Sequence, residues 1–327
     1  MIEKKTILIT GGTGSFGKKF VEIALNRYRP RRIIIFSRDE LKQHDMQLRY
    51  PDRRLSFFIG DIRDGDRLKR AFEAQVDYVI HAAALKQVVA CEYNPFEAVK
   101  TNIHGAQNII DAAIDCGVSK VIGLSTDKCV NPINLYGATK LCAEKLFVQG
   151  NAYAGAKNTK FSCVRYGNVV GSRGSVIPLF LEQRKNGKIT VTDRRMTRFW
   201  LTLEQAVEFV VKCLGMMQGG EVFIPRLPSM SVIDVVRALA PEAEIEFTGI
   251  KPGEKIHEEL LSSNESRHTV ALEDMLVIKP EFHTWGDLSM LEGKSLPDRF
   301  ELRSDNNDTW LSAEELRKMV ESLKETH

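Results

Sequence analysis

The first half of the chain alternates short runs of β-branched and aliphatic residues with longer segments of helical periodicity. The apolar runs are continuous, which is typical of strands buried on both faces of a parallel sheet. The predicted strands are residues 6–10, 32–37, 55–60, 76–82, 120–125 and 160–166. The predicted helices between them are residues 16–28, 66–74, 95–116 and 136–153. This order predicts an α/β fold, a Rossmann-type doubly wound parallel sheet.

Beyond about residue 170 this regular alternation loosens. The pattern predicts a loop and helix within 171–187, an amphipathic helix at 202–217 and a helix at 229–241. Residues 280–310, rich in Pro, Asp and Asn, are expected to form an ordered loop. We therefore expect a dinucleotide-binding domain at 1–170 and a smaller, mainly substrate-binding α/β part at 171–327, with some later segments returning to the first domain.

Composition narrows the class of protein. The 46 basic and 43 acidic residues give a net charge of +3, too balanced to indicate a nucleic-acid partner. The six cysteines form no CxxC pair and no zinc spacing, so we expect reduced thiols and no metal site. No uncharged apolar run approaches the roughly 20 residues of a membrane span. The N-terminal MIEKKTILIT is too short for a signal peptide. A cytoplasmic protein without a membrane partner is expected.

A glycine-rich run directly follows the first predicted strand. Gly11, Gly14 and Gly17 in GGTGSFG lie where that strand ends and a helix begins. Glycines there allow a tight turn and close backbone approach to a pyrophosphate, while the helix N-terminus supplies unpaired N–H groups. The run predicts a dinucleotide site; the alternative is a plain turn whose glycines serve packing.

The ends of the following strands refine the cofactor prediction. Arg38 follows Ser37 at the end of the second strand, and Asp39 comes only afterwards. An acidic residue at the strand tip suits the 2′-hydroxyl of NAD, whereas arginine suits the 2′-phosphate of NADP, so NADP is favoured over NAD. Asp61 and Ile62 are expected beside the adenine. The small residues 82–84 are expected to let the chain pass beside the cofactor.

Tyr136 and Lys140 lie one helical turn apart and therefore on the same face. A nearby ammonium, with the positive nicotinamide close by, favours phenolate and lowers the pKa of a tyrosine, which can then take a proton from an alcohol. A surface pair is the alternative. The position after a strand ending in Ser125 and Thr126 favours the chemical interpretation.

Eight motifs between Thr6 and about Ser262 together resemble the extended short-chain dehydrogenase/reductases that act on nucleotide sugars. They are TGGTGSFG, SRDELKQ, HAAALK, YNPFEAVKTN, LSTDK, NLYGATK, VRYGNVVGSRGSV and PGEKIHE. Within that family, Asp127-Lys128 followed by NPxNxYGATK is similar to the inverting UDP-N-acetylglucosamine 4,6-dehydratases, which start the pseudaminic acid pathway. Retaining relatives that act on dTDP- or GDP-sugars carry Asp-Glu at this place, so Lys128 indicates inversion.

The resemblance implies a role for each residue of the site. Tyr136 would take the 4-hydroxyl proton as hydride leaves C4, a neutral Lys128 would remove the C5 proton, and Asp127 would protonate the departing 6-hydroxyl. The implied catalytic residues are Thr126, Asp127, Lys128, Tyr136 and Lys140. The expected NADP-binding residues are Gly11, Thr13, Gly14, Ser15, Phe16, Gly17, Ser37, Arg38, Lys42, Asp61, Ile62, Ala83, Lys86, Tyr136, Lys140 and Val169. The expected UDP-N-acetylglucosamine-binding residues are Lys86, Asn168, Arg173, Thr190, Thr192, Arg198, Lys251 and Glu254.

Two other functions stay open. A UDP-sugar 4-epimerase or reductase of the same superfamily would need neither an acid for O6 nor a base for C5, so Asp127-Lys128 argues against it. A non-catalytic, NADP-sensing Rossmann protein would have no need of both Tyr136 and Lys140. Arg198 has structural ion pairing as its alternative, and Lys251 stands where relatives often have arginine. A homo-oligomer is expected.

Overall fold

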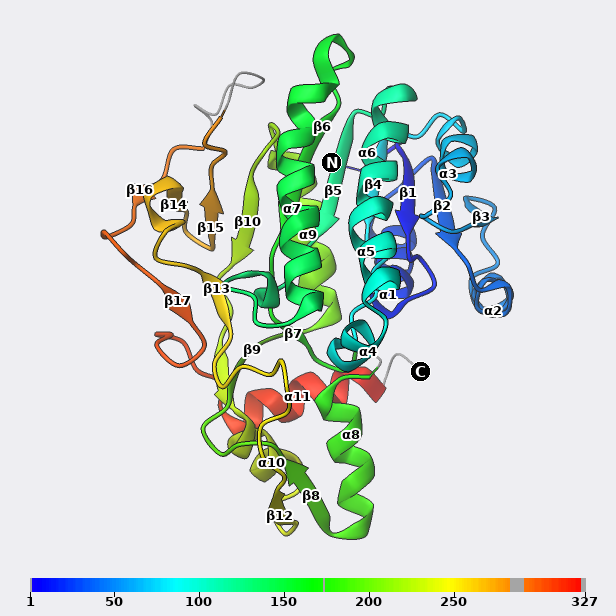
Figure 1. Ribbon diagram of the computed structural model, residues 1–327. Helices are drawn as coiled ribbons and strands as arrows, with labels where there is room; N and C mark the ends of the chain where they lie inside the picture. The colour runs from blue at the N-terminus through cyan, green and yellow to red at the C-terminus, as the bar shows by residue number, and fades with distance from the viewer. Residues whose placement is uncertain (1, 173, 283–290, 325–327) are drawn as a thin grey trace.

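The computed structural model describes residues 2–172, 174–282 and 291–324. Its centre is a sheet whose strands follow the order β16-β14-β15-β10-β6-β5-β4-β1-β2-β3 (Figure 1). These strands are β1 Thr6–Thr10, β2 Arg32–Ser37, β3 Leu55–Ile59, β4 Tyr78–His81, β5 Lys120–Leu124, β6 Lys160–Val164, β10 Val222–Pro225, β14 Thr269–Ala271, β15 Met275–Ile278 and β16 Lys294–Ser295. The series β3-β2-β1-β4-β5-β6 is parallel throughout, which is the order of the Rossmann fold. The predicted fold class and all six predicted strands are confirmed.

Segments from beyond residue 170 extend this sheet. Strand β10 pairs in parallel with β6, and β15, β14 and β16 then add antiparallel neighbours. The segment at 280–310, expected to be loop, contains β16 and β17 (Leu302–Arg303); its residues 283–290 lie outside the described residues. The sheet therefore draws on both halves of the chain.

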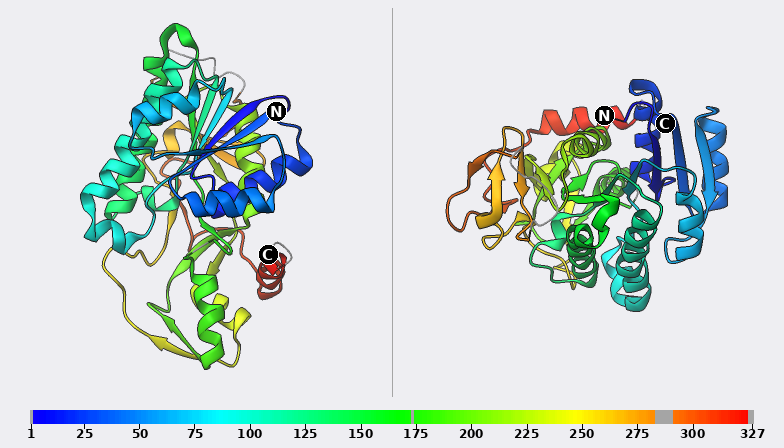
Figure 2. Two further views of the ribbon diagram at one scale, coloured as in Figure 1. Left: turned by 90° about the vertical axis from the view of Figure 1, so that its right-hand side faces the viewer. Right: turned by 90° about the horizontal axis from the view of Figure 1, so that it is seen from above.

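Helices cover both faces of the sheet (Figures 1 and 2). One face carries α1 (Ser15–Arg27) and α9 (Leu203–Met216). The other carries α3 (Gly65–Phe72), α6 (Gly105–Asp115) and α7 (Leu135–Ala154). Each layer buries an apolar stripe against the β-branched strands, as expected of a sheet buried on both sides.

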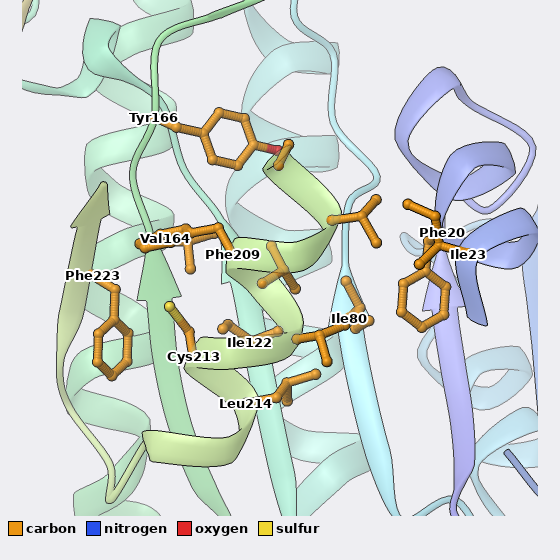
Figure 3. Close-up of a cluster of buried hydrophobic side chains, with 14 of the residues drawn as sticks. Phe20, Ile23, Ile80, Ile122, Val164, Tyr166, Phe209, Cys213, Leu214 and Phe223 are labelled. Carbon is orange, nitrogen blue, oxygen red and sulfur yellow. The ribbon is translucent and has the colours of Figure 1, made fainter. Parts of the chain in front are cut away.

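The packing beneath α9 shows how the second half of the chain is anchored. Phe209, Cys213 and Leu214 on α9 pack against Ile122 of β5 and Val164 of β6 (Figure 3). All five side chains are buried. The predicted helix at 202–217 is confirmed, and its apolar face completes the core of the parallel sheet.

Several helices differ from the sequence prediction. The helix predicted at 95–116 is divided into α5 (Pro95–Val99), a π-helical turn (Lys100–His104) and α6. Asn102 in that turn hydrogen-bonds the backbone of Leu85 through both its amide oxygen and its amide nitrogen. The short helices α2 (Glu40–Arg49) and α4 (Val88–Tyr93) were not predicted, because neither shows a clear apolar stripe.

A smaller lobe lies beneath the sheet in Figure 1. It contains α8 Val176–Gln183, β8 Lys188–Val191, α10 Val232–Leu239, β12 Glu244–Phe247 and α11 Ala313–Lys324. It has its own apolar cluster, which includes Phe180, Trp200 and Leu316. The helix predicted at 229–241 begins only at 232, because β11 (Ser229–Ser231) pairs with β9 (Thr197–Leu201). Helix α11 was not predicted. Among the described residues, no helix has the length and apolar character needed to cross a bilayer.

A buried ion cluster joins the two halves of the chain behind residues 126–128, which are predicted to be catalytic. The Arg165 guanidinium, on the chain just after β6, binds the carboxylates of Glu144 on α7 and Glu265. It also donates to the carbonyl of Leu260, at 3.0 Å. Arg165 and Glu144 are almost completely inaccessible to solvent. Such a cluster is sensitive to loss of one partner, since the remaining charges stay buried.

We expect Arg165→Met to lower the free energy of unfolding by about 3–5 kcal/mol, because the buried Glu144 carboxylate and the partly buried Glu265 carboxylate lose their counter-ion. Chemical denaturation followed by circular dichroism would measure the change. Arg27→Met is the control: Arg27 pairs with Glu204 and Glu208 on the surface, and its loss should cost at most about 1 kcal/mol. Equal losses in the two variants would contradict this assignment.

Candidate active site

A cleft of about 2300 Å³ runs between the ends of the parallel strands and the small lobe. With the exceptions of Gly17 and Arg173, every residue predicted for the site lines it. Gly17 lies beneath the glycine loop, and Arg173 lies outside the described residues. Residues separated by more than 200 positions in the sequence, such as Gly14 and Lys251, thus share one cavity.

The glycine loop is shaped for close approach by a ligand. Gly11 has φ of +66°, a conformation that glycine adopts without strain, and its N–H donates to the Phe36 carbonyl at 2.9 Å. A Cβ on Gly17 would overlap the carbonyl of Gly12, so the helix can pack against the loop only without a side chain there. Helix α1 begins at Ser15 with no side-chain cap. Its first N–H groups can therefore receive a pyrophosphate.

The end of β2 places both Arg38 and Asp39 at the cleft. Asp39 caps α2 by accepting from the Lys42 N–H at 3.0 Å, and it also binds the Lys42 ammonium. Arg38 is more than half exposed, and its Nη1 lies 3.6 Å from Asp61 Oδ2. The ion pairs of Asp61 with Arg63 and Arg38 outweigh burial and lower the pKa of its carboxyl. Because the Asp39 carboxylate caps α2, the exposed Arg38 guanidinium is the group at the end of β2 that favours an anionic ligand.

The catalytic segment is a 3₁₀ turn, Asp127–Cys129, directly after β5. Thr126 precedes it, and its hydroxyl donates to Asp127 Oδ1 at 3.0 Å. Lys128 Nζ donates to the same oxygen at 3.1 Å. The second oxygen of Asp127, Oδ2, is buried without a hydrogen-bond partner among the described residues. The structure thus brings together the acid and the base that the sequence predicted, in direct contact.

Lys128 has a second carboxylate partner that the sequence prediction missed. Glu258 Oε1 lies 3.1 Å from Lys128 Nζ and 3.7 Å from Arg198 Nε. The Glu258 side chain is only 3% exposed, against 24% for Lys128. The alternation of side chains in the extended segment IHEELL could have indicated that Glu258 points inward. Glu258 lies two residues before the buried Leu260, so the two side chains point to the same face.

These contacts set the charges of the cluster. Burial raises the pKa of Asp127, and the nearby Glu258 carboxylate raises it further. Burial lowers the pKa of Lys128, but the carboxylates of Asp127 and Glu258 outweigh it and raise that pKa above its usual range. The pKa of Lys128 is therefore shifted away from the neutral amine that the resemblance implied, so a neutral Lys128 requires that its proton moves to a neighbouring group. Its nearest neighbours are anions, and the expectation of an acid that retains its proton agrees with the environment of Asp127.

Tyr136 and Lys140 both lie in the cleft on α7, which begins at Leu135 with Asn134 as its cap. Burial raises the pKa of Tyr136 to about 12, while the Lys128 ammonium and a hydrogen bond with Thr126 act in the opposite direction. Burial lowers the pKa of Lys140. The lowering of the Tyr136 pKa that was predicted for Lys140 together with the positive nicotinamide stays a prediction. Within the protein, Lys128 is the cation that acts most on this phenol.

The small lobe supplies the opposite wall. Asn168 and Val169 form β7, which pairs with β9 beside the cleft. Thr190 is partly committed, because its hydroxyl accepts from Gln183 at 2.9 Å. The Thr192 hydroxyl contacts the sulfur of Met196 at 3.0 Å.

Arg198 is largely engaged within the protein. Its guanidinium donates to the carbonyls of Thr197 and Ile256 at 2.7 and 2.8 Å and to that of Lys255 at 3.0 Å. These bonds favour the structural alternative for Arg198, and its binding of pyrophosphate stays a prediction.

A segment at 251–259 lies along the catalytic turn. The Lys255 ammonium donates to the Val130 carbonyl at 2.6 Å, and the Asn134 amide donates to the Gly253 carbonyl at 2.7 Å. Lys251 and Glu254 line the cleft at the start of this segment, and Glu258 lies near its end. We call residues 251–259 the strap. It physically connects the predicted nucleotide contacts with the Lys128 amine.

The parallel sheet, the glycine loop and the cleft together are typical of the short-chain dehydrogenase/reductase class. The chain belongs to the polysaccharide biosynthesis protein family, whose model matches residues 7–280.

The chain is similar over nearly its whole length to enzymes that act on nucleotide sugars and to one solved structure. The chain is 50% identical to the inverting UDP-N-acetylglucosamine 4,6-dehydratase of Campylobacter jejuni, over 98% of each protein. It is 40% identical to the UDP-glucose 4-epimerase of Rickettsia conorii, over 99% of this chain and 97% of that protein. The X-ray structure of Pen from Bacillus thuringiensis superposes with a TM-score of 0.89 at 42% identity, covering 98% of this chain and 99% of that one.

Replacing Gly17 with alanine tests the loop geometry. We expect Gly17→Ala to weaken NADP⁺ binding by at least about tenfold, because the added methyl group displaces α1 from the loop. Titration calorimetry would measure the dissociation constant. Gly65→Ala is the matched control: it also lies at the start of a helix, and its Cβ would meet nothing closer than 3.7 Å. Unchanged affinity in Gly17→Ala would contradict the predicted pyrophosphate site.

Proposed function

We propose that this protein is an inverting UDP-N-acetylglucosamine 4,6-dehydratase that uses NADP. The observation that carries the proposal is the buried Asp127 carboxylate, 3.1 Å from the partly exposed Lys128 amine, in a cleft that also holds the glycine loop and Tyr136. The similarity to the Campylobacter jejuni dehydratase supports it over nearly the whole chain. The expected product is UDP-2-acetamido-2,6-dideoxy-β-L-arabino-hex-4-ulose, and the reaction would be the first step of pseudaminic acid biosynthesis.

The cofactor, when bound, supplies a hydride acceptor for C4 and later a hydride donor for C6. Tyr136 takes the proton of the 4-hydroxyl during the oxidation. Its buried phenol has a pKa of about 12, so it needs further positive charge to act as phenolate at neutral pH. A 4-ketone then makes the C5 proton acidic, which prepares the elimination.

Asp127 and Lys128 perform the elimination as a pair. Shifting one proton from Lys128 Nζ to Asp127 Oδ1 along their hydrogen bond converts an ion pair into a carboxylic acid and a free amine. The net charge of the pair does not change, so burial does not oppose this shift as it would oppose a single ionisation. Lys128 then takes the C5 proton and Asp127 protonates O6, which leaves as water. A proton delivered to C5 from the opposite face inverts that centre.

The similarity to UDP-glucose 4-epimerases makes epimerisation the second candidate. An epimerase oxidises C4 and reduces it again, so it needs Tyr136 but no acid for O6 and no base for C5. The buried Asp127 carboxylate beside the Lys128 amine favours the dehydratase, because a buried charge without a function is costly to maintain.

Product analysis decides between these functions. Purified protein incubated with UDP-N-acetylglucosamine should convert the C6 hydroxymethyl group into a methyl group, visible by proton NMR. A 4-epimer with an intact C6 would establish the epimerase. Absence of any turnover with NADP⁺ supplied would contradict both enzymes.

Two substitutions separate the steps. Lys128→Met should still oxidise C4, seen as absorbance of the reduced nicotinamide, but should form methyl product at least about 100-fold more slowly, because a general base typically contributes 10²–10⁴-fold. Tyr136→Phe should lose the oxidation itself. Methyl product formed at the normal rate by Lys128→Met would contradict its role as the base.

Arg38 is the residue that we expect to select NADP. Arg38→Ala should weaken NADP⁺ binding by about 10- to 100-fold, since a hydrogen bond to a charged group contributes about 1.5–3 kcal/mol. NAD⁺ binding should change little, because Asp39 remains the cap of α2. Calorimetry with both dinucleotides measures the ratio, and equal loss for the two would contradict selection by Arg38.

A further inference from the structure

Glu258 lies at the centre of the charged cluster, yet no step of the proposed reaction uses it. Its Oε1 is 3.1 Å from Lys128 Nζ, the same distance that separates Nζ from Asp127 Oδ1. The amine is therefore held between two carboxylates that come from different parts of the chain. One precedes it on the same turn, and the other reaches it from the strap.

Hydrogen bonds between its backbone and Ser304 fix the position of Glu258. Its backbone N–H donates to Ser304 Oγ at 3.0 Å, and its carbonyl accepts from the Ser304 N–H at 2.8 Å. Its second carboxylate oxygen, Oε2, is buried without a hydrogen-bond partner among the described residues. A buried carboxylate that serves only structure normally has both oxygens paired. Glu258 instead directs one oxygen at an amine that is partly open to the cleft.

The charges around Glu258 keep it ionised. Lys128 approaches from the catalytic turn, Arg198 from β9 and Lys255 from the strap itself, while Asp127 is the nearby anion. Burial raises the pKa of Glu258, but these cations, Lys128 above all, outweigh it and lower that pKa below its usual value. Glu258 is thus a permanent negative charge beside a group that we expect to gain and lose a proton.

We propose that Glu258 is a positioning residue of the elimination step: it holds the Lys128 amine toward C5 and stabilises the ammonium that forms there. This inference rests on the proposed dehydratase function. As the C5–H bond breaks, its proton goes to Lys128, the electron pair forms the C5–C6 double bond, and the C6–O bond breaks as Asp127 gives its proton to O6. The pair ends as carboxylate and ammonium, and the Glu258 charge favours that ammonium.

Glu258→Gln preserves the shape of the side chain and removes its charge. The pKa values of both Lys128 and Asp127 should fall, because Glu258 raises both. The proton that the pair shares is then lost at lower pH. In the plot of dehydration rate against pH, we expect the alkaline limb to move to lower pH by about 1–3 units. The rate at neutral pH should fall by about 10- to 100-fold. The rate of C4 oxidation, measured by the absorbance of the reduced nicotinamide, should stay within about twofold of the wild-type value. The KM should also stay within about twofold of the wild-type value.

Glu259→Gln is the matched control. Glu259 is the next residue, carries the same side chain and pairs with Asn131 and Lys255 instead of Lys128. Its variant should retain the wild-type rate and the wild-type alkaline limb. Glu258→Asp keeps the negative charge but places it farther from Lys128, because the side chain is shorter. This variant should keep the alkaline limb of the pH–rate profile near that of the wild type and should have a lower dehydration rate.

The outcomes separate this inference from the function on which it rests. A wild-type protein that forms no methyl product removes the proposed function itself. With the function established, a Glu258→Gln variant with a normal dehydration rate and an unmoved alkaline limb would overturn the role of Glu258. Parallel loss of oxidation and dehydration with an unmoved limb would show a purely structural residue. If Glu258→Gln does not fold, an unchanged dehydration rate in Glu258→Asp would overturn the proposal as well.

Discussion

The site depends on one lysine amine that lies between two buried carboxylates. The Lys128 side chain stays partly open to the cleft, and its ammonium compensates the charges of Asp127 and Glu258, which could not be buried as deeply without it. In the proposed mechanism, one short proton shift within this cluster creates the acid and the base together. The proposed chemistry follows from this arrangement more than from any single residue.

The fold is organised so that these charges meet. Strand β5 ends at the catalytic turn, and the strap crosses it from a segment about 125 residues later, with bonds at Val130 and Asn134. Asn134 also caps the helix that carries Tyr136, so one side chain links the strap to the oxidation site. Behind the turn, the Arg165 cluster fixes α7 to the chain after β6. The predicted nucleotide contacts at Lys251 and Glu254 are thereby tied to the position of the amine.

Short-range patterns in the sequence were sufficient to predict much of the fold and of the candidate site. The six parallel strands, the glycine loop and the Tyr136–Lys140 spacing follow from short-range periodicity and turn chemistry, and the structure places them as expected. Strands β10, β14 and β15 were not foreseen because their pairing joins distant segments and antiparallel edges. The raised pKa of Lys128 was not foreseen for the same reason: Glu258 is adjacent only in three dimensions. Arg198 looked available in sequence, but the carbonyls that it binds become neighbours only through folding.

Deuterium labelling tests the central claim most directly, that a base in this cleft removes the C5 proton and a proton returns from the other face. The protein would be incubated with UDP-N-acetylglucosamine in D₂O and the sugar followed by proton NMR. The account predicts a 4-keto-6-deoxy product with deuterium at C5 and couplings of the L-arabino configuration. A product that retains its C5 proton, or that carries deuterium with the original configuration, would contradict it.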